Sequence, residues 1–153
     1  MTDGIRGARV ALQCPLCLDV AEIELVAGTT RSTCPSCQRP LLVDRPVPLG
    51  DEAFDRVLRG TELPVVVDFH AEWCAPCRMT APLLDELALD MAGRAMVFKV
   101  DIDANPDAPL RLGVRSIPTL VAFRGGVEVT REVGMPTPAR LRAMVEPELT
   151  PAA

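Results

Sequence analysis

The chain has 153 residues, of which 48% are hydrophobic and 24% are charged, and its formal net charge is −5. This composition predicts a soluble globular protein and excludes a disordered chain. Residues 1–45 carry five arginines against five acidic residues, so the excess of acid lies in the remainder, and we expect no basic face for nucleic acid or anionic lipid.

No apolar run reaches the length of about 18 residues that a membrane-spanning helix needs, so no membrane segment is predicted. Residues 1–9 include an aspartate, two glycines and two arginines, and they lack the apolar core of a signal peptide. We therefore expect a cytoplasmic protein in a reducing thiol pool. In that compartment its six cysteines should be metal ligands, catalytic thiols or both, rather than structural disulfides.

Four of the cysteines form two C-P-x-C motifs separated by sixteen residues. Between the motifs, Val20–Leu25 roughly alternates apolar and polar residues, as a half-exposed strand does. Each motif can offer two thiolates to one side, and two motifs complete the tetrahedral four-sulfur site that structural zinc prefers. The expected ligands of one structural zinc ion are Cys14, Cys17, Cys34 and Cys37.

We predict a small zinc-ribbon-like domain over residues 1–45 that depends on metal ligation for much of its folding free energy. Four reduced buried thiols, or two disulfides, are the alternative, which the paired spacing and the reducing compartment disfavour. Stability or partner contact is the default role of this unit, and redox sensing by its thiolates is a further hypothesis.

From residue 46 onward, strand and helix patterns alternate. Residues 44–50, with two prolines and one glycine, are typical of a linker, in which 47–49 can add a short edge strand. The other elements are expected in this order: a helix at 51–58, a strand at 63–70, a helix at 75–91 with a kink at Pro82, a strand at 95–101, a short helix capped by Asn105 and ending near Gly113, a hairpin of strands at 119–123 and 127–133, and a helix from Thr137 to about Val145. This order predicts an α/β domain over 46–153 with a mixed central sheet flanked by helices.

The remaining cysteines lie in Trp73-Cys74-Ala75-Pro76-Cys77, at the predicted junction of a strand and a helix. Two thiols at this spacing can close a disulfide with little motion, and the helix N-terminus favours the thiolate of the first. The pattern therefore indicates redox chemistry, with a structural pair or half of a zinc site as the alternative. Asp68 interrupts the preceding apolar strand, which predicts a desolvated carboxyl group with a raised pKa.

The segment from Val67 to Met79 closely resembles the active-site segment of the thioredoxin family. Further motifs follow in that family's order and spacing, namely Pro82, Lys99-Val100-Asp101, Asn105-Pro106, Ser116-Ile117-Pro118-Thr119 and Gly125-Gly126. With the two cysteine motifs in front, the chain is similar to the zinc-binding thioredoxin-2 type. The resemblance covers about residues 47–148 for the thioredoxin fold and 9–43 for the zinc unit.

This resemblance implies site residues as well as a fold. Cys74 would be the nucleophile, and Cys77 would resolve the mixed disulfide. Asp68 would accept the proton of Cys77, with Lys99, the sole lysine, as its partner. The alternative to a role in proton transfer is that Asp68 is simply a buried carboxyl group satisfied by the backbone or by Lys99. Substrate contact is expected from four residues: Trp73, Ile117, Pro118 and Gly134.

The resemblance also implies a cis Ile117–Pro118 bond that faces the dithiol. Two residues depart from the family pattern, since His70 stands where tryptophan is usual and Ala75 where glycine is usual. The first departure can change the thiol pKa or the substrate preference. The alternative for His70 is a polar side chain that lies beside the dithiol with its hydrogen bonds satisfied and does not tune it. The alternative for Trp73 is an ordinary, partly buried aromatic side chain without a role in substrate contact.

The functional prediction is a thioredoxin-type protein-disulfide reductase with a redox-active Cys74–Cys77 disulfide and no organic cofactor. Its expected partners are disulfide-containing proteins and thioredoxin reductase, with no nucleic acid and no membrane, and the chain is expected to be a monomer. A disulfide oxidase or isomerase is one alternative, which would need a less stable disulfide and an oxidising compartment. A zinc-dependent binding or chaperone module is the other.

Overall fold

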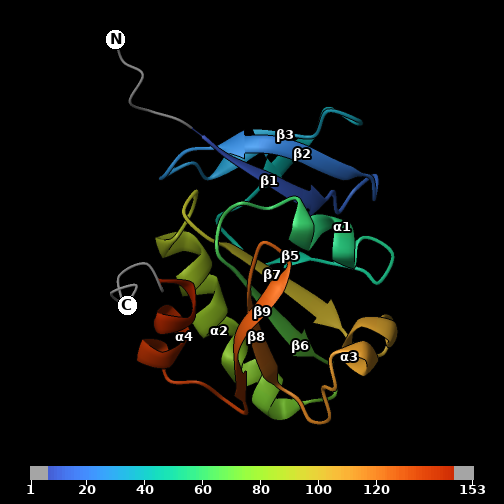
Figure 1. Ribbon diagram of the computed structural model, residues 1–153, viewed down its shortest axis with the longest axis vertical. Coiled ribbons are helices and arrows are strands. Elements are labelled where there is room, and N and C mark those ends of the chain that lie inside the picture. Colours follow the sequence, from blue (N-terminus) through green and yellow to red (C-terminus); the bar gives the residue numbers. More distant parts are fainter. Residues whose placement is uncertain (1–6, 147–153) are drawn as a thin grey trace.

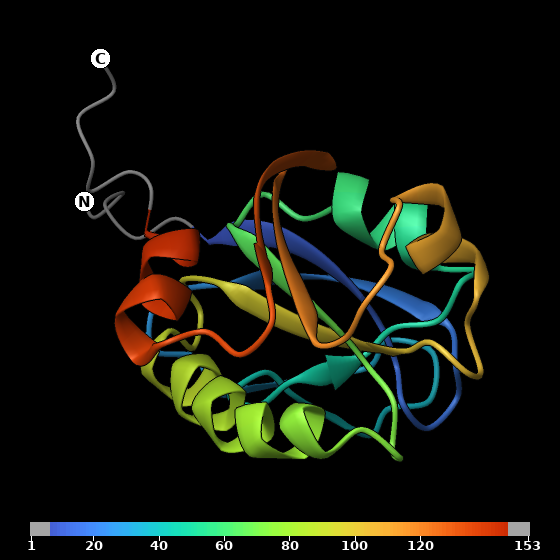
Figure 2. The same cartoon turned by 90° about the horizontal axis from the view of Figure 1, so that it is seen from below.

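The computed structural model describes residues 7–146 (Figure 1), so the predictions for residues 1–6 and for the end of the second domain lie outside the described residues. The described chain forms three sheets. Two are small antiparallel pairs at the N-terminal end, and the third is a five-stranded mixed sheet with helices on both faces (Figures 1 and 2). None of the helices in this range is long and apolar enough to cross a membrane.

The two small sheets come from the segment with the C-P-x-C motifs. β1 (Ala8–Gln13) pairs with β2 (Val20–Leu25), which confirms the strand predicted at 20–25, and β3 (Arg31–Thr33) pairs with β4 (Pro40–Leu42). One cysteine motif lies in each connecting turn. The sequence does not predict strand β1, because its residues do not alternate between apolar and polar. In the structure the consecutive residues Val10, Ala11 and Leu12 are all buried.

These strands share a hydrophobic core with the rest of the chain. The same cluster contains the buried residues of helix α1 (Phe54–Arg59) and of one face of the large sheet. From the N-terminal segment it includes Val10, Ala11, Leu12, Ala21, Leu25, Leu41 and Val43. Packing against the other elements therefore stabilises this segment in addition to any metal it holds.

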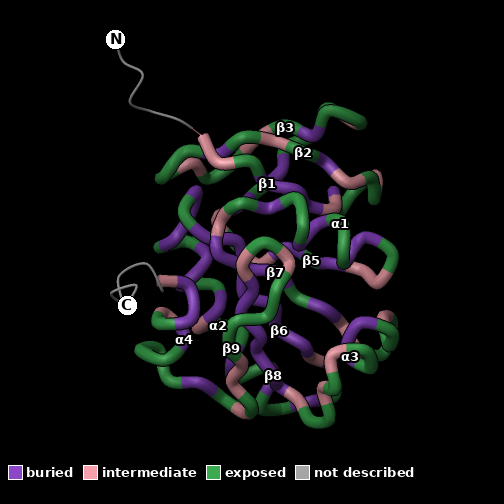
Figure 3. Tube along the Cα trace, viewed as in Figure 1, coloured by how far each residue is buried: buried purple, intermediate pink, exposed green. Residues whose placement is uncertain are grey.

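The five strands of the large sheet follow the spatial order β5-β7-β6-β8-β9. Their bounds are β5 (Val47–Pro48), β6 (Val65–His70), β7 (Met96–Asp101), β8 (Thr119–Arg124) and β9 (Val127–Val133). The first three run parallel and the last two form an antiparallel hairpin. The predicted α/β class, the mixed sheet and the edge strand at 47–49 are thus confirmed. Figure 3 shows that the central strands are the most buried.

Helices cover both faces of this sheet (Figure 2). α1 and α3 (Asp107–Arg111) lie on the face that also receives the N-terminal strands, and α2 (Ala75–Asp90) and α4 (Pro138–Val145) lie on the other. α2 starts soon after β6 and contains Pro82. α4 begins after Thr137, as the sequence predicts, and the Thr137 hydroxyl caps it by accepting the Arg140 N–H at 3.1 Å.

Alternation along β6 decides which face each side chain occupies. Val65, Val67 and Phe69 belong to the core with α1, whereas Val66 belongs to the core beneath α2 and α4. Asp68 shares the parity of Val66. Its carboxyl group therefore points toward α2, the helix that begins with the dithiol.

The expected cap of the short helix α3 is wrong. Asn105 does not cap it, because its side-chain oxygen accepts the Asp51 N–H at 3.0 Å. The cap comes instead from Asp51, whose carboxylate accepts the N–H groups of Asp107 and Ala108, each at 2.9 Å. A residue more than fifty positions away thus satisfies the first donors of α3.

A close backbone approach joins the N-terminal strands to the rest of the chain. The Thr61 hydroxyl accepts the Ala11 N–H and donates to the Ala11 carbonyl, both at 3.1 Å. Gly93 has φ +77°, and a Cβ there would lie 2.0 Å from the Val26 carbonyl oxygen. Only glycine allows this approach.

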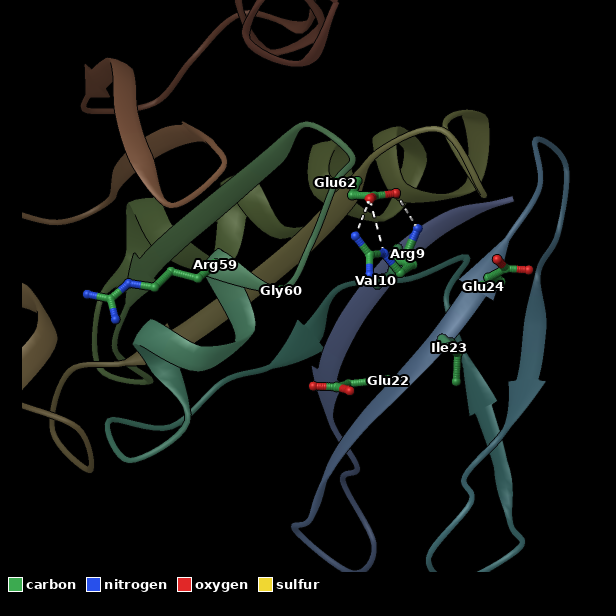
Figure 4. Close-up of a pocket in the computed structure, with 8 residues that line it drawn as sticks. All are labelled: Arg9, Val10, Glu22, Ile23, Glu24, Arg59, Gly60 and Glu62. Atoms are coloured by element: carbon green, nitrogen blue, oxygen red, sulfur yellow. Dashed lines mark hydrogen bonds and ion pairs between the residues drawn. The ribbon is translucent and has the colours of Figure 1, made fainter. Parts of the chain in front are cut away.

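A cavity of about 440 Å³ lies between β1, β2 and the end of α1. Figure 4 shows the residues that line it. Arg9 lies beside it and forms an ion pair with Glu62 at 3.1 Å. Both side chains are largely exposed, so the pair contributes little stability. None of the predicted site residues lines this cavity.

Candidate active site and metal site

Cys74 and Cys77 lie where β6 gives way to α2. Cys74 is the N-cap of α2, and its Sγ accepts the Cys77 N–H at 3.2 Å. The two sulfurs lie at disulfide-bonding distance with their Cα atoms 5.2 Å apart. Cys74 is 5% exposed and Cys77 is 4% exposed. The partial positive charge of the helix N-terminus favours the thiolate of Cys74 when the pair is reduced.

The Ile117–Pro118 segment faces the first sulfur. The peptide bond between the two residues is cis, as expected, and the Ile117 carbonyl oxygen lies 3.9 Å from Cys74 Sγ. Gly134 lies next to this segment, because its N–H donates to the Pro118 carbonyl at 2.8 Å. Gly134 has φ +90° and open space where a Cβ would stand, so another backbone can approach here.

A groove of about 490 Å³ runs along this side of the dithiol. It is lined mostly by apolar side chains: Trp73, Ile102, Pro106, Pro109, Leu110, Val114 and Ile117, with Arg115 and Ser116. Trp73 is 67% exposed, and its Nε1 donates to Asp103 Oδ2 at 2.8 Å. The groove could hold an extended apolar segment next to Cys74.

Asp68 lies on the opposite side of the dithiol, beneath α2. It is 4% exposed, and its Oδ1 is buried without a hydrogen-bond partner among the described residues. Burial raises the pKa of Asp68 to about 7, although the positive charge of Lys99 opposes the rise. Lys99 is its register partner on β7. Asp68, Lys99 and Cys77 line one cavity of about 330 Å³, so water can connect the carboxyl group to the second sulfur.

His70 closes the same cavity at the end of β6. Burial lowers its pKa, and the nearby Asp101 carboxylate only partly offsets this. The imidazole is therefore neutral at pH 7. His70 also lines a second cavity of about 470 Å³, whose other wall includes Cys14 and Leu18 of the first cysteine motif.

The other four cysteines converge on one point. Their sulfurs all lie within 4.8 Å of one another, with 3.8 Å from Cys14 to Cys37 and 3.7 Å from Cys17 to Cys34. A tetrahedron with zinc–sulfur bonds of about 2.3 Å has edges of about 3.8 Å, whereas a disulfide would need about 2.05 Å. The spacing therefore fits a four-thiolate metal site and not a pair of disulfides.

Both motifs use the same backbone fold to aim their sulfurs. The Cys14 N–H donates to the Asp19 carbonyl at 2.8 Å, and the Cys34 N–H donates to the Arg39 carbonyl at 2.9 Å. The residue after each second cysteine has a positive φ, 69° at Leu18 and 65° at Gln38. These turns also direct the Asp19 N–H at the Cys17 sulfur and the Arg39 N–H at the Cys37 sulfur.

The thiol pKa values agree with a site built for a cation. Burial raises the pKa of Cys14, but hydrogen bonds from backbone N–H groups and neighbouring thiols outweigh this and lower it to about 7. The Asp19 N–H lowers the pKa of Cys17, but burial and the other thiols raise it to about 12. The first thiol ionises readily and then opposes ionisation of its neighbours, so four thiolates need a bound cation.

A dithiol at the N-terminus of the helix that follows the central strand of a mixed sheet defines a thiol–disulfide oxidoreductase. A family model described as Thioredoxin matches residues 45–147 of this chain. The chain belongs to the thioredoxin family, and the Cys74–Cys77 pair is its dithiol for dithiol–disulfide exchange. The four-cysteine segment precedes the matched range.

Named relatives agree with this assignment. The thioredoxin of Rickettsia bellii is 42% identical over 85 residues, which are 56% of this chain and 81% of that protein. The thioredoxin of Synechocystis sp. is 42% identical over 98 residues, 64% of this chain and 92% of that protein. The solved structure of a mutant thioredoxin from Halobacterium salinarum matches with a TM-score of 0.64 and 33% identity, covering 72% of this chain and 96% of that one.

The structure brings the predicted residues together in two separate groups. The first lies around Cys74 and Cys77, with the groove residues on one side and Asp68 on the other. The second is the four-cysteine cluster. Sequence reasoning missed Asp103, the partner of Trp73, and Asp51, which caps α3. Asp51 stands at the start of the helix predicted at 51–58, so the residues around it indicate a role in that helix. They give no signal of its contact with α3.

We expect Asp68→Asn to stabilise the protein at neutral pH. Asp68 ionises near pH 3.8 when unfolded and near 7 when folded, so its contribution to stability is greatest below pH 3.8 and is lost as the pH rises to about 7. A shift of this size corresponds to about 4 kcal/mol as an upper bound. Urea unfolding at pH 8 should therefore give a larger free energy of unfolding for Asp68→Asn, and the two proteins should converge at pH 4.

Proposed function

We propose that this chain reduces disulfides of other proteins in a reducing compartment, the cytoplasm, as a monomer recycled by thioredoxin reductase. The position of Cys74 carries the proposal, because its sulfur stands at the N-terminus of α2 and lies 3.9 Å from the carbonyl oxygen of Ile117, a residue that lines the groove. A thiolate placed there is activated by the helix and lies next to a surface that can hold the substrate chain.

The reaction moves two electrons in two exchanges. The Cys74 thiolate attacks one sulfur of the substrate disulfide and forms a mixed disulfide, and the other substrate sulfur leaves as a thiolate that takes up a proton. Cys77 then gives its proton to the Asp68 carboxylate and attacks Cys74 Sγ. This attack releases the second substrate thiolate and leaves the Cys74–Cys77 disulfide.

Asp68 suits its part because its pKa of about 7 lets it accept and return a proton near neutral pH. Lys99 moderates that pKa through its charge, which keeps a fraction of Asp68 ionised. We expect Asp68→Asn to slow the second exchange by about 10- to 100-fold at pH 7. In stopped-flow experiments the wild-type rate should rise with pH up to about 7, and the variant should lack that rise.

For the four cysteines we infer one structural zinc ion. The sulfur spacing and the all-thiolate donor set support zinc in preference to the oxygen-seeking calcium or magnesium. When bound, zinc would join the two cysteine motifs and stabilise their turns. No step of the disulfide exchange passes through it.

The groove is proposed as the substrate site, with Trp73, Ile117, Pro118 and Gly134 in contact with the bound chain. Leu110 of α3 lines it and is 79% exposed. We expect Leu110→Ser to raise the half-saturating insulin concentration about threefold and to leave the maximal rate unchanged. Leu89→Ser is the matched control, because Leu89 is 58% exposed on α2 and does not line the groove. Equal effects of the two variants would exclude this groove as the substrate site.

The whole proposal is tested by insulin reduction with NADPH and thioredoxin reductase. Turnover by the wild-type protein is expected, and its absence would refute reductase activity. The reduction potential distinguishes the alternatives: a value near about −270 mV supports a reductase, and one near about −180 mV supports an isomerase.

A further inference from the structure

The Gln13 side chain links the first cysteine motif to the segment that enters the thioredoxin fold. Its Nε2 donates to the Leu18 carbonyl at 3.2 Å, and its Oε1 accepts the Gly50 N–H at 3.0 Å. Leu18 is the positive-φ residue that follows Cys17. One amide group therefore holds both the turn that aims the Cys14 and Cys17 sulfurs and the backbone just before Asp51.

Asp51 continues this link to α3. Its N–H donates to Asn105 Oδ1 at 3.0 Å, and its carboxylate accepts the N–H groups of Asp107 and Ala108, both at 2.9 Å. α3 has only five residues and no side-chain cap from the residue at its own N-cap. Asp51 is therefore the group that orients the first turn of this helix.

Gly50 is the point where the two halves of the link meet. A Cβ at Gly50 would lie 3.3 Å from Gln13 Oε1 and 3.3 Å from Asn105 Oδ1, so both side chains converge on it. Gln13, Leu18, Gly50 and Asn105 all line the cavity of about 470 Å³. Leu49 and Ala53 on either side of Gly50 are buried in the shared core, and the hydrogen bonds from Gly50 to Gln13 and from Asp51 to Asn105 add to that packing.

The α3 region, which Asp51 contacts, lines the groove beside the dithiol. Pro106, Pro109 and Leu110 of the α3 region form one of its walls. A second tie holds α3 to α1, the ion pair between Arg111 and Asp55 at 3.5 Å. Both of those side chains are about half exposed, so this tie is weak.

We propose that Gln13 and Asp51 are positioning residues that couple the first cysteine motif to the α3 wall of the groove and thereby set the affinity for protein substrates. The proposal rests on the substrate role of the groove proposed above. Neither residue touches the dithiol sulfurs in any contact of the described chain, so the chemical step should not depend on them.

The experiment compares Gln13→Met and Asp51→Asn with a matched control, Gln38→Met. Gln38 is a glutamine beside the second motif, at the position that Leu18 holds in the first, and its Nε2 donates to the Pro35 carbonyl at 3.0 Å, within that motif alone. Gln13→Met keeps the length of the side chain but loses both hydrogen bonds. Asp51→Asn leaves one acceptor oxygen for the two N–H groups of α3.

Two readouts are measured on the full chain with its metal bound. One is single-turnover oxidation of the reduced protein by increasing insulin, followed through the fluorescence of Trp73, the only tryptophan. The other is amide hydrogen exchange of Asp107 and Ala108. Melting curves and metal content establish that each variant is folded and loaded.

Gln13→Met and Asp51→Asn should each raise the half-saturating insulin concentration about threefold and leave the maximal rate and the reduction potential unchanged. Exchange at Asp107 and Ala108 should accelerate at least about threefold in both variants. Gln38→Met should change neither the half-saturating insulin concentration nor the exchange rates of Asp107 and Ala108.

Unchanged exchange in Gln13→Met would overturn the coupling. Faster exchange with unchanged half-saturation, or an equal effect of Gln38→Met, would overturn the link to substrate affinity. A failure of the proposed function would appear in the wild type itself as absent insulin oxidation. The exchange rates, which need no activity, would then still decide whether the link exists.

Discussion

Replacing Cys74 with serine should abolish insulin reduction, lowering the rate by more than about 1,000-fold. A serine hydroxyl is not ionised at neutral pH, even at the N-terminus of α2, and it cannot form the mixed disulfide. Turnover is measured with NADPH and thioredoxin reductase. Unchanged turnover in Cys74→Ser would remove this residue from the mechanism.

The companion variant Cys77→Ser separates the two exchanges. It should still attack a substrate disulfide through Cys74, but the mixed disulfide should then accumulate because no second thiol resolves it. Mass spectrometry without reductant should detect one insulin molecule attached per protein molecule. The double variant Cys74→Ser/Cys77→Ser is the control and should capture none. Capture by Cys74→Ser alone would reverse the roles of the two cysteines.

Replacing Cys34 with serine should have the largest effect on stability. Cys34 is fully buried within the four-sulfur cluster, and its loss would leave three thiolates for the proposed metal ion. Structural zinc sites contribute about 10–16 kcal/mol of apparent binding free energy, and much of it is folding free energy. We therefore expect the free energy of unfolding to fall by several kcal/mol and the Tm by more than about 10 °C.

The matched control for this variant is Ser36→Ala, which changes a residue within the same motif that is not a ligand. It should keep about one zinc per chain by elemental analysis, whereas Cys34→Ser should lose it. The core shared between β1, β2 and α1 should spread the loss beyond the N-terminal segment. A Cys34→Ser protein with full zinc content and unchanged Tm would exclude the four-thiolate site.

The zinc-dependent binding alternative makes a different prediction for the same variants. If protection of an unfolded client from aggregation is lost in Cys34→Ser and kept in Cys74→Ser, the four-cysteine unit has a binding role of its own. If protection is absent in the wild type, that alternative is excluded.

Much of the fold can be predicted because its signals are local. The apolar strand before Cys74, the Thr137 cap and the Gly125-Gly126 turn each depend on residues within a few positions of one another. The Asn105 cap fails for the opposite reason. The sequence around Asn105 is compatible with capping, and only the approach of Asp51 directs its side chain elsewhere.

The four-cysteine cluster and the dithiol site show the same difference between what local sequence signals predict and what depends on tertiary packing. The spacing of the C-P-x-C motifs indicates two knuckles, but the meeting of Cys14 with Cys37 and of Cys17 with Cys34 depends on how the two hairpins pack. The alternation of side chains along a strand predicts that Asp68 lies on the same face of the sheet as Val66. That its Oδ1 lacks a hydrogen-bond partner among the described residues is visible once the surrounding side chains are placed.

Residue type and short spacing are therefore enough to predict three things: the order of most elements, the redox character of Trp73 to Cys77, and the division of the six cysteines into four for metal and two for exchange. Two further features became visible in the folded chain. The cysteine segment shares its core with α1, and the side chains of Gln13 and Asp51 accept hydrogen bonds from the N–H groups of Gly50 and Ala108. Such contacts link positions between about thirty-five and sixty residues apart, where loop closure and packing, not local pattern, select the partners.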